Sequence, residues 1–125
     1  MPAGSIRRTR ILPSAGDVVV IDFPGVQGIK RRPAVVLSSA VYHASRPDVV
    51  VGLITSRAVA AGPTDHVLYD WAEAGLRVPS VFRSFFATLP PAAHPVAVGR
   101  LSDRDWQDVQ ACVKTALAPL DKPDA

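Results

Sequence analysis

Three consecutive basic side chains, Lys30, Arg31 and Arg32, stand directly before Pro33 and a short apolar run. A guanidinium stays charged at physiological pH and can hold two phosphoryl oxygens at once. The chain also carries an excess of basic groups before residue 60, where eight side chains are basic and three are acidic. The basic ones are Arg7, Arg8, Arg10, Lys30, Arg31, Arg32, Arg46 and Arg57, and the acidic ones are Asp17, Asp22 and Asp48. Such a field would attract a polyanion such as RNA, although scattered surface charge without a partner is about as common.

Other side chains are of types that contact nucleic-acid bases. Gln27 precedes the basic run and could hydrogen-bond a base edge, and Phe85 or Phe86 could stack on a base, as aromatic residues do in single-strand-binding proteins. We expect at least one of these phenylalanines to pack in the core instead. Trp71 and Trp106 are assigned mainly to packing because both stand in apolar stripes.

Metal centres and disulfides are not expected from this composition. The chain has one cysteine, Cys112, so it can form neither an internal disulfide nor a thiolate zinc or iron–sulfur cluster, and we expect this thiol to be a small buried group on the last helix. No apolar run approaches the roughly 18 residues that span a bilayer, and the first dozen residues lack the apolar core of a signal peptide. The sequence therefore predicts a cytoplasmic protein without metal, cofactor or membrane contact.

A chain of 125 residues has the size of a single domain. Residues 1–15 are predicted to form a mobile arm, 16–118 the domain and 119–125 a tail. Short runs rich in β-branched residues predict strands, which are expected over residues 17–23, 33–38, 48–54, 66–69, 79–87 and 96–100. The segment between the first two strands carries Pro24, Gly25 and Gly28, so it is expected to be a loop with the basic run at its tip. Short strands without helical crossovers favour an antiparallel barrel.

The clearest helix is predicted over residues 102–116. Ser102 can cap its N-terminus, and Asp103 and Asp105 stand where the helix dipole favours negative charge. Apolar residues recur at helical spacing from Trp106 onward, and Pro119 prevents continuation. We therefore expect a mainly β fold completed by a C-terminal α-helix that packs one stripe on the barrel.

Several short motifs, in this order along residues 16–117, together resemble the MazF/PemK family of toxin–antitoxin ribonucleases. They are a Gly-Asp strand that ends in Asp-Phe (residues 16–23), an Arg-Pro followed by a Val/Leu strand (32–38), an Ile-Thr-Ser triplet (54–56) and a Gly-Arg-Leu-Ser segment before the last helix (99–102). The middle segment, with Asp70-Trp71, Ala74-Gly75-Leu76 and Pro79-Ser80, is similar to the PemK-like branch. Each motif alone is weak evidence, whereas the ordered set is specific.

The resemblance implies an SH3-like antiparallel barrel of the MazF/Kid/CcdB toxin type. It further implies a homodimer whose groove holds single-stranded RNA, and a cognate antitoxin protein that blocks that groove. The activity implied is metal-independent, sequence-specific cleavage of mRNA. In that reaction the ribose 2′-OH attacks the adjacent phosphorus and leaves a 2′,3′-cyclic phosphate and a 5′-OH end, so one group must take a proton, another must give one, and cations must meet the growing negative charge.

The same resemblance suggests roles for particular residues. Arg32 matches the arginine that is usually catalytic in the family, and Thr55 matches an active-site threonine whose hydroxyl can donate to the phosphate. Arg83 matches an arginine that some PemK-like members use, and it could assist protonation of the leaving group. Lys30, Arg31 and Ser56, with Gln27 and Phe85, are expected to bind RNA.

The sequence departs from the family pattern at the general base. Phe85 stands where PemK-like members often carry an acidic residue, two positions after Arg83, and the loop glutamate common before Arg-Pro is absent from residues 24–28. His43 occupies a position where relatives often have asparagine, and histidine titrates near neutrality. His43 is therefore a candidate base, although a lone histidine is more often a surface or capping residue.

Two other functions fit the same fold, because fold does not dictate function. One is a CcdB-like toxin that binds DNA gyrase and catalyses nothing. The other is an RNA-binding barrel without turnover, such as a decayed toxin. Arg32, Thr55 and the Arg-Pro motif favour the ribonuclease, whereas the missing carboxylates leave room for the alternatives.

Overall fold

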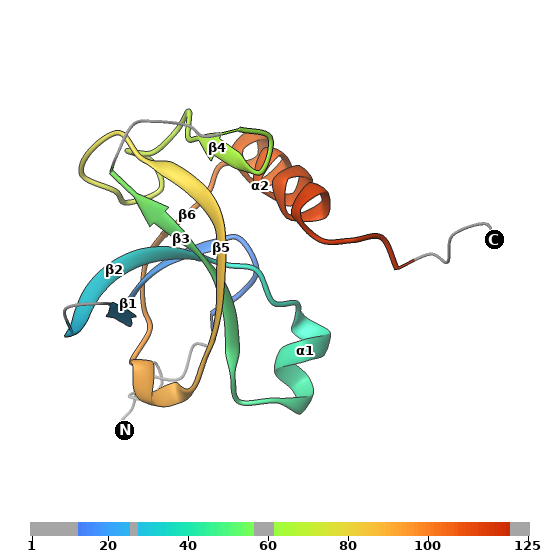
Figure 1. Ribbon diagram of the computed structural model, residues 1–125. Coiled ribbons are helices and arrows are strands. Elements are labelled where there is room, and N and C mark those ends of the chain that lie inside the picture. The colour runs from blue at the N-terminus through green and yellow to red at the C-terminus, as the bar shows by residue number, and fades with distance from the viewer. Residues whose placement is uncertain (1–12, 26–27, 57–61, 121–125) are drawn as a thin grey trace, which may run out of the picture.

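A curled antiparallel sheet with a C-terminal helix forms the protein in the computed structural model, which describes residues 13–25, 28–56 and 62–120. The sheet order is β4-β5-β3-β2-β1-β6. In chain order the elements are β1 (Asp17–Gly25), β2 (Gly28–Val36), α1 (Ala40–Ser45), β3 (Val49–Thr55), β4 (Asp65–Val67), β5 (Val81–Leu89), η2 (Pro91–Ala93), β6 (Val96–Arg100) and α2 (Asp103–Ala116). Figure 1 shows β1 and β2 crossing β3 and β5, with α2 beside β4 and α1 near the opposite end. The predicted mainly β fold with a C-terminal helix is confirmed.

The hairpin of β1 and β2 is longer than the sequence suggested. Its ladder runs from Val18 opposite Val35 to Gly25 opposite Gly28, so the basic run lies within β2. The predicted loop with a basic tip is wrong in this respect. Turn-forming Pro24, Gly25 and Gly28 concealed the strand, but pairing with β1 satisfies the backbone of this segment and overrides local propensity.

The core consists of two clusters, one on each face of the sheet. Along β1, Val18 belongs to one cluster and Val19 to the other, as alternation in a strand requires. The first cluster joins Ile54 and Phe82 to Val109 of α2 and to the predicted buried Cys112. The second gathers residues of the β1–β2 and β3–β5 strands, namely Val19, Ile21, Phe23, Ala34, Val36, Val49, Val51 and Leu89, with Ala93. Trp71 and Trp106 pack against the first cluster, as expected.

The two helices differ in how well the sequence signals them. Ser102 caps α2 by accepting a hydrogen bond from the Asp105 amide, as predicted. Helix α1 was not predicted, because the segment after residue 39 has no helical stripe of apolar residues. It begins at the cap provided by Ser39 and buries none of its own residues. Among the described helices none is long and apolar enough to cross a membrane.

Candidate functional site

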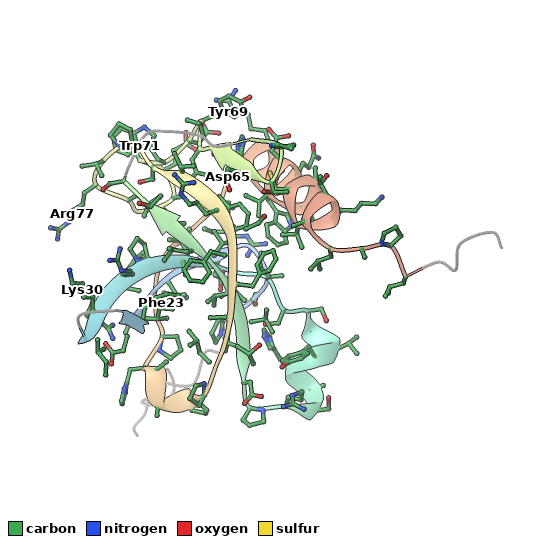
Figure 2. All side chains as sticks on the ribbon, viewed as in Figure 1. Phe23, Lys30, Asp65, Tyr69, Trp71 and Arg77 are labelled. Atoms are coloured by element: carbon green, nitrogen blue, oxygen red, sulfur yellow. The ribbon has the colours of Figure 1, made fainter. Side chains whose placement is uncertain are left out.

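A groove of about 700 Å³ lies between β2 and the segment that precedes β5. One wall is β2 from Lys30 to Pro33, and the other is the segment from Gly75 to Val78. The end of β3 contributes Ile54, Thr55 and Ser56, and Val20 and Val98 complete the lining together with Ser80. Figure 2 shows Lys30 and Arg77 at this side of the molecule, away from α2. The structure thus brings five predicted site residues together: Lys30, Arg31, Arg32, Thr55 and Ser56.

Arg32 and Thr55 lie just beyond the end of the β2–β3 ladder. That ladder joins Val36 to Val51 and ends with Ala34 opposite Leu53, two residues from Arg32 on one strand and two residues from Thr55 on the other. Both side chains are half-buried and line the groove. The groove therefore offers a guanidinium and a hydroxyl to the same ligand.

The groove cations differ in how they are compensated. Arg31 donates to the Asp22 carboxylate at 2.8 Å and to the Val20 carbonyl at 3.3 Å, so its charge is neutralised locally. Within the described residues, Lys30, Arg32 and Arg77 form no ion pair. Among the described residues that line the groove there is no aspartate, glutamate, histidine or cysteine. Its local field is therefore positive and suits an anion.

The second wall of the groove belongs to the segment between β4 and β5, residues 68–80. Buried hydrogen bonds hold the beginning of this segment in place. Asp105 of α2 is fully buried and accepts from the Tyr69 and Asp70 amides at 2.9 and 2.8 Å, and its carboxylate contacts His66 Nε2 at 2.8 Å. Arg104 makes two 2.8 Å hydrogen bonds to Asp70 and holds the pKa of that carboxyl well below its usual value, with further help from the Ser102 hydroxyl. The beginning of the wall is thus tied to the last helix.

Gly75 allows the same segment to pass close to β6. Its φ of +90° lies in the left-handed region, and an added Cβ would stand 2.3 Å from the Val98 carbonyl oxygen. On the other side, a Cβ on Gly99 would stand 2.1 Å from the Ala74 carbonyl oxygen. Two glycines are therefore needed for this contact, which places Leu76, Arg77 and Val78 along the groove.

Arg77 is a groove residue that the sequence reasoning missed. Basic residues are concentrated before residue 60, and an isolated arginine in a turn-rich segment carries no signal of its own. The one available clue was its place two residues after Gly75, in a segment that resembles the PemK-like branch.

Arg83 and Phe85 lie outside the groove lining but on a related face of the sheet. Val81 pairs with Thr55, and alternation along β5 places residues 83 and 85 on the face that carries Thr55. Arg83 donates to the Asp65 carboxylate at 2.8 Å, so its charge is already compensated. Phe85 is 55% exposed and its ring meets that of Phe23 edge to face at a centroid distance of 5.6 Å. The Phe85 side chain is therefore accessible to a ligand.

His43 is not brought to the groove. It lies on α1, where its Nε2 is 2.5 Å from the buried Ser38 hydroxyl, and it lines two smaller cavities near residues 13 and 48. Its position does not support a role as base for a reaction at Arg32; instead it bonds a buried hydroxyl that also accepts from the Val50 amide. Gln27 lies outside the described residues. Over the described ranges, no three His, Cys, Asp or Glu side chains gather as a metal site would require.

Comparison with solved structures shows the same fold in several bacterial toxins. A chain of a MazE–MazF complex from Deinococcus radiodurans aligns with a TM-score of 0.69 at 22% identity, over 85% of this chain and 96% of that one. An endoribonuclease from a mycobacterial species, in complex with its cognate antitoxin, aligns with a TM-score of 0.68 at 19% identity, over 90% and 100%. Mycobacterium tuberculosis toxin MazF-mt6 aligns with a TM-score of 0.65 at 22% identity, over 80% and 94%.

These identities establish the fold alone, and no curated protein sequence matches the chain significantly. The family assignment rests on the sequence, because residues 14–117 match the family described as PemK-like, MazF-like toxins of type II toxin–antitoxin systems. The match spans the whole sheet and α2, including both walls of the groove. The chain therefore belongs to the PemK/MazF family of type II toxins.

Proposed function

We propose that this toxin is a metal-independent endoribonuclease that cleaves single-stranded RNA in the groove between β2 and residues 75–78. The observation that supports this best is that Arg32 and Thr55 line one groove, which holds three cations that have no ion-pair partner among the described residues. Because the described part of the groove lining holds no acidic side chain, an RNA phosphate would enter without repulsion from it.

The groove residues would act mainly on the charge of the transition state. When the 2′-OH attacks phosphorus, negative charge grows on the non-bridging oxygens, and Arg32 can hold two of them. The Thr55 hydroxyl can donate to a third acceptor of the same phosphate. A positively charged groove also disfavours a divalent cation, so the reaction is expected to proceed without one.

A protein antitoxin is the second proposed partner. Two of the aligned toxins were solved in complex with an antitoxin. An acidic, partly disordered segment would be attracted by the same cations as RNA. We further propose that the toxin acts as a homodimer in the cytoplasm, where its expected substrate, mRNA, is found.

The decisive experiment incubates the purified protein with a long single-stranded RNA in EDTA and maps the ends of the products. We expect cleavage, with a 2′,3′-cyclic phosphate on one fragment and a 5′-OH on the other. Activity that disappears on chelation and returns with Mg²⁺ would contradict the metal-independent mechanism. RNA binding without any cleavage would indicate an RNA-binding barrel, and inhibition of DNA gyrase without RNA binding would indicate a CcdB-like toxin.

A further inference from the structure

Arg77 stands on the wall of the groove that faces β2. It is exposed, it lines the groove together with Lys30 and Arg32, and it forms no ion pair within the part of the chain that is described. Figure 2 shows the Arg77 and Lys30 side chains extending from the same side of the molecule. Cations on both walls mean that an anionic strand in the groove would be contacted from two sides.

The segment that carries Arg77 is held in place on both sides of this residue. Before it, the Leu76 amide donates to the Trp71 carbonyl at 3.1 Å and Gly75 packs on the Val98 carbonyl. After it, Ser80 is buried, its hydroxyl donates to the Val78 carbonyl at 2.7 Å, and its own carbonyl accepts from Leu68. A residue presented by a fixed backbone loses less entropy on binding than one on a mobile loop.

The size and lining of the groove exceed what one phosphate needs. A volume of about 700 Å³ falls within the range of sites that enclose whole small molecules. Besides the cations and hydroxyls, the lining includes five apolar side chains: Val20, Ile54, Leu76, Val78 and Val98. Phosphates can therefore lie along the charged walls while sugar or base covers the apolar surface between them.

We infer that Arg77 binds a backbone phosphate of the RNA other than the one held by Arg32, so that the groove grips two phosphates of one strand. This inference rests on the proposed function. Arg77 then contributes to RNA affinity and to its salt dependence, whereas the chemical step depends on Arg32. The substrate must accordingly extend beyond the phosphodiester that is cleaved.

The test compares wild type with Arg77→Ala, Arg77→Lys and Lys114→Ala. Lys114 is a matched control because it is an exposed cation on α2, away from the groove, with no ion pair in the described ranges. Affinity for a single-stranded 2′-O-methyl RNA, which lacks the attacking hydroxyl, is measured by fluorescence anisotropy at several KCl concentrations. Cleavage of the natural RNA is measured under single-turnover conditions at saturating protein.

We expect Arg77→Ala to weaken binding several-fold and to reduce the slope of log affinity against log salt by about 0.7, the value for one phosphate contact on a single strand. Arg77→Lys should retain most of the slope because it retains the charge, and Lys114→Ala should match wild type. Cleavage by Arg77→Ala at saturation should stay within about threefold of wild type.

Two results would overturn the inference. If Arg77→Ala binds like Lys114→Ala, Arg77 contacts no phosphate, and if Arg77→Ala stops cleavage of fully bound RNA, Arg77 acts in the chemical step. Failure of the wild type itself to bind the 2′-O-methyl RNA would contradict the proposed function together with the inference, so the two failures are distinguishable.

Discussion

At the scale of single residues, the neighbours Lys30, Arg31 and Arg32 carry the same formal charge but have different surroundings. Arg31 is bound to Asp22, Lys30 is exposed near the end of the hairpin, and Arg32 is half-buried in the groove that Thr55 also lines. A cation that is fixed beside a hydroxyl can stabilise a transition state, whereas an exposed one mainly attracts the substrate. Different contacts therefore predict different kinetic effects for three adjacent substitutions.

Replacing Arg32 by alanine should stop turnover. Loss of a charged donor to the transition state typically costs about 10²- to 10³-fold in rate. Single-turnover cleavage at saturating protein measures this effect free of any change in affinity. If the Arg32→Ala variant cleaves fully bound RNA as fast as wild type, Arg32 is a binding residue only, and Arg83 becomes the leading candidate.

Lys30→Ala and Arg31→Ala should differ in RNA binding. Lys30→Ala should lower the salt slope by about 0.7, because a cation without an ion-pair partner among the described residues is lost. Arg31→Ala should change the slope less, because Asp22 already neutralises this guanidinium. Equal slopes for the two variants, measured by anisotropy titrations in KCl, would show that the Arg31–Asp22 pair opens when RNA binds.

At the scale of elements, the wall formed by residues 75–78 depends on α2 and β6, which lie far from it in sequence. Asp105 of α2 binds the amides at the beginning of the segment, and the Gly75–Gly99 contact fixes its middle against β6. Changes distant from the groove should therefore alter RNA binding by moving Arg77.

Gly75→Ala should both destabilise the fold and weaken RNA binding. The positive φ costs on the order of 1–3 kcal/mol, and the new methyl group would collide with the Val98 carbonyl. Gly62→Ala is a suitable control, because Gly62 also has a positive φ but no atom within 4 Å of the new Cβ. Denaturant unfolding and RNA titration should show the larger loss for Gly75→Ala, and an unchanged RNA affinity would mean that the wall does not position Arg77.

The Asp70–Arg104 pair should make stability depend on acid pH. Arg104 lowers the pKa of Asp70 in the folded state, so this carboxylate stabilises the fold above its unfolded pKa of about 3.9. The stabilisation is lost progressively as pH falls through the folded-state pKa. The difference in melting temperature between wild type and Asp70→Asn should therefore be full near neutrality and begin to shrink below about pH 4, and a difference independent of pH would argue against the ion pair.

At the scale of the whole molecule, charge is unevenly distributed along the chain. Basic groups outnumber acidic ones in the first 60 residues, and Lys30, Arg31 and Arg32 among them line the groove, whereas eight of the 11 acidic side chains follow residue 60. The positively charged groove is thus suited to polyanions, and RNA and an acidic antitoxin segment would compete for it.

Competition between antitoxin and RNA should be complete. An acidic antitoxin segment that occupies the groove would cover Lys30, Arg32 and Arg77, so RNA would be displaced in a titration monitored by anisotropy. Native mass spectrometry should find either binary complex and no ternary one. A stable ternary complex would place the antitoxin on another surface.

The sequence by itself determined the order and type of most elements, because their signals are local. The strand over residues 96–100, the helix capped by Ser102 and the burial of Cys112 follow from β-propensity, capping and helical spacing. The ordered motifs also identified the family and pointed to Arg32 and Thr55, which the fold brings to one groove. Proposed roles in catalysis remain predictions.

Only the tertiary structure decided which charged groups share a groove. Arg77 lines the groove because Gly75 and Gly99 allow close contact between segments more than 20 residues apart. Arg31 is neutralised by Asp22 across the hairpin, and His43 lies on α1, outside the groove. Such placements depend on strand register and on the packing of distant backbone, and a one-residue slip would send each side chain to the opposite face. No local pattern of residues contains that information.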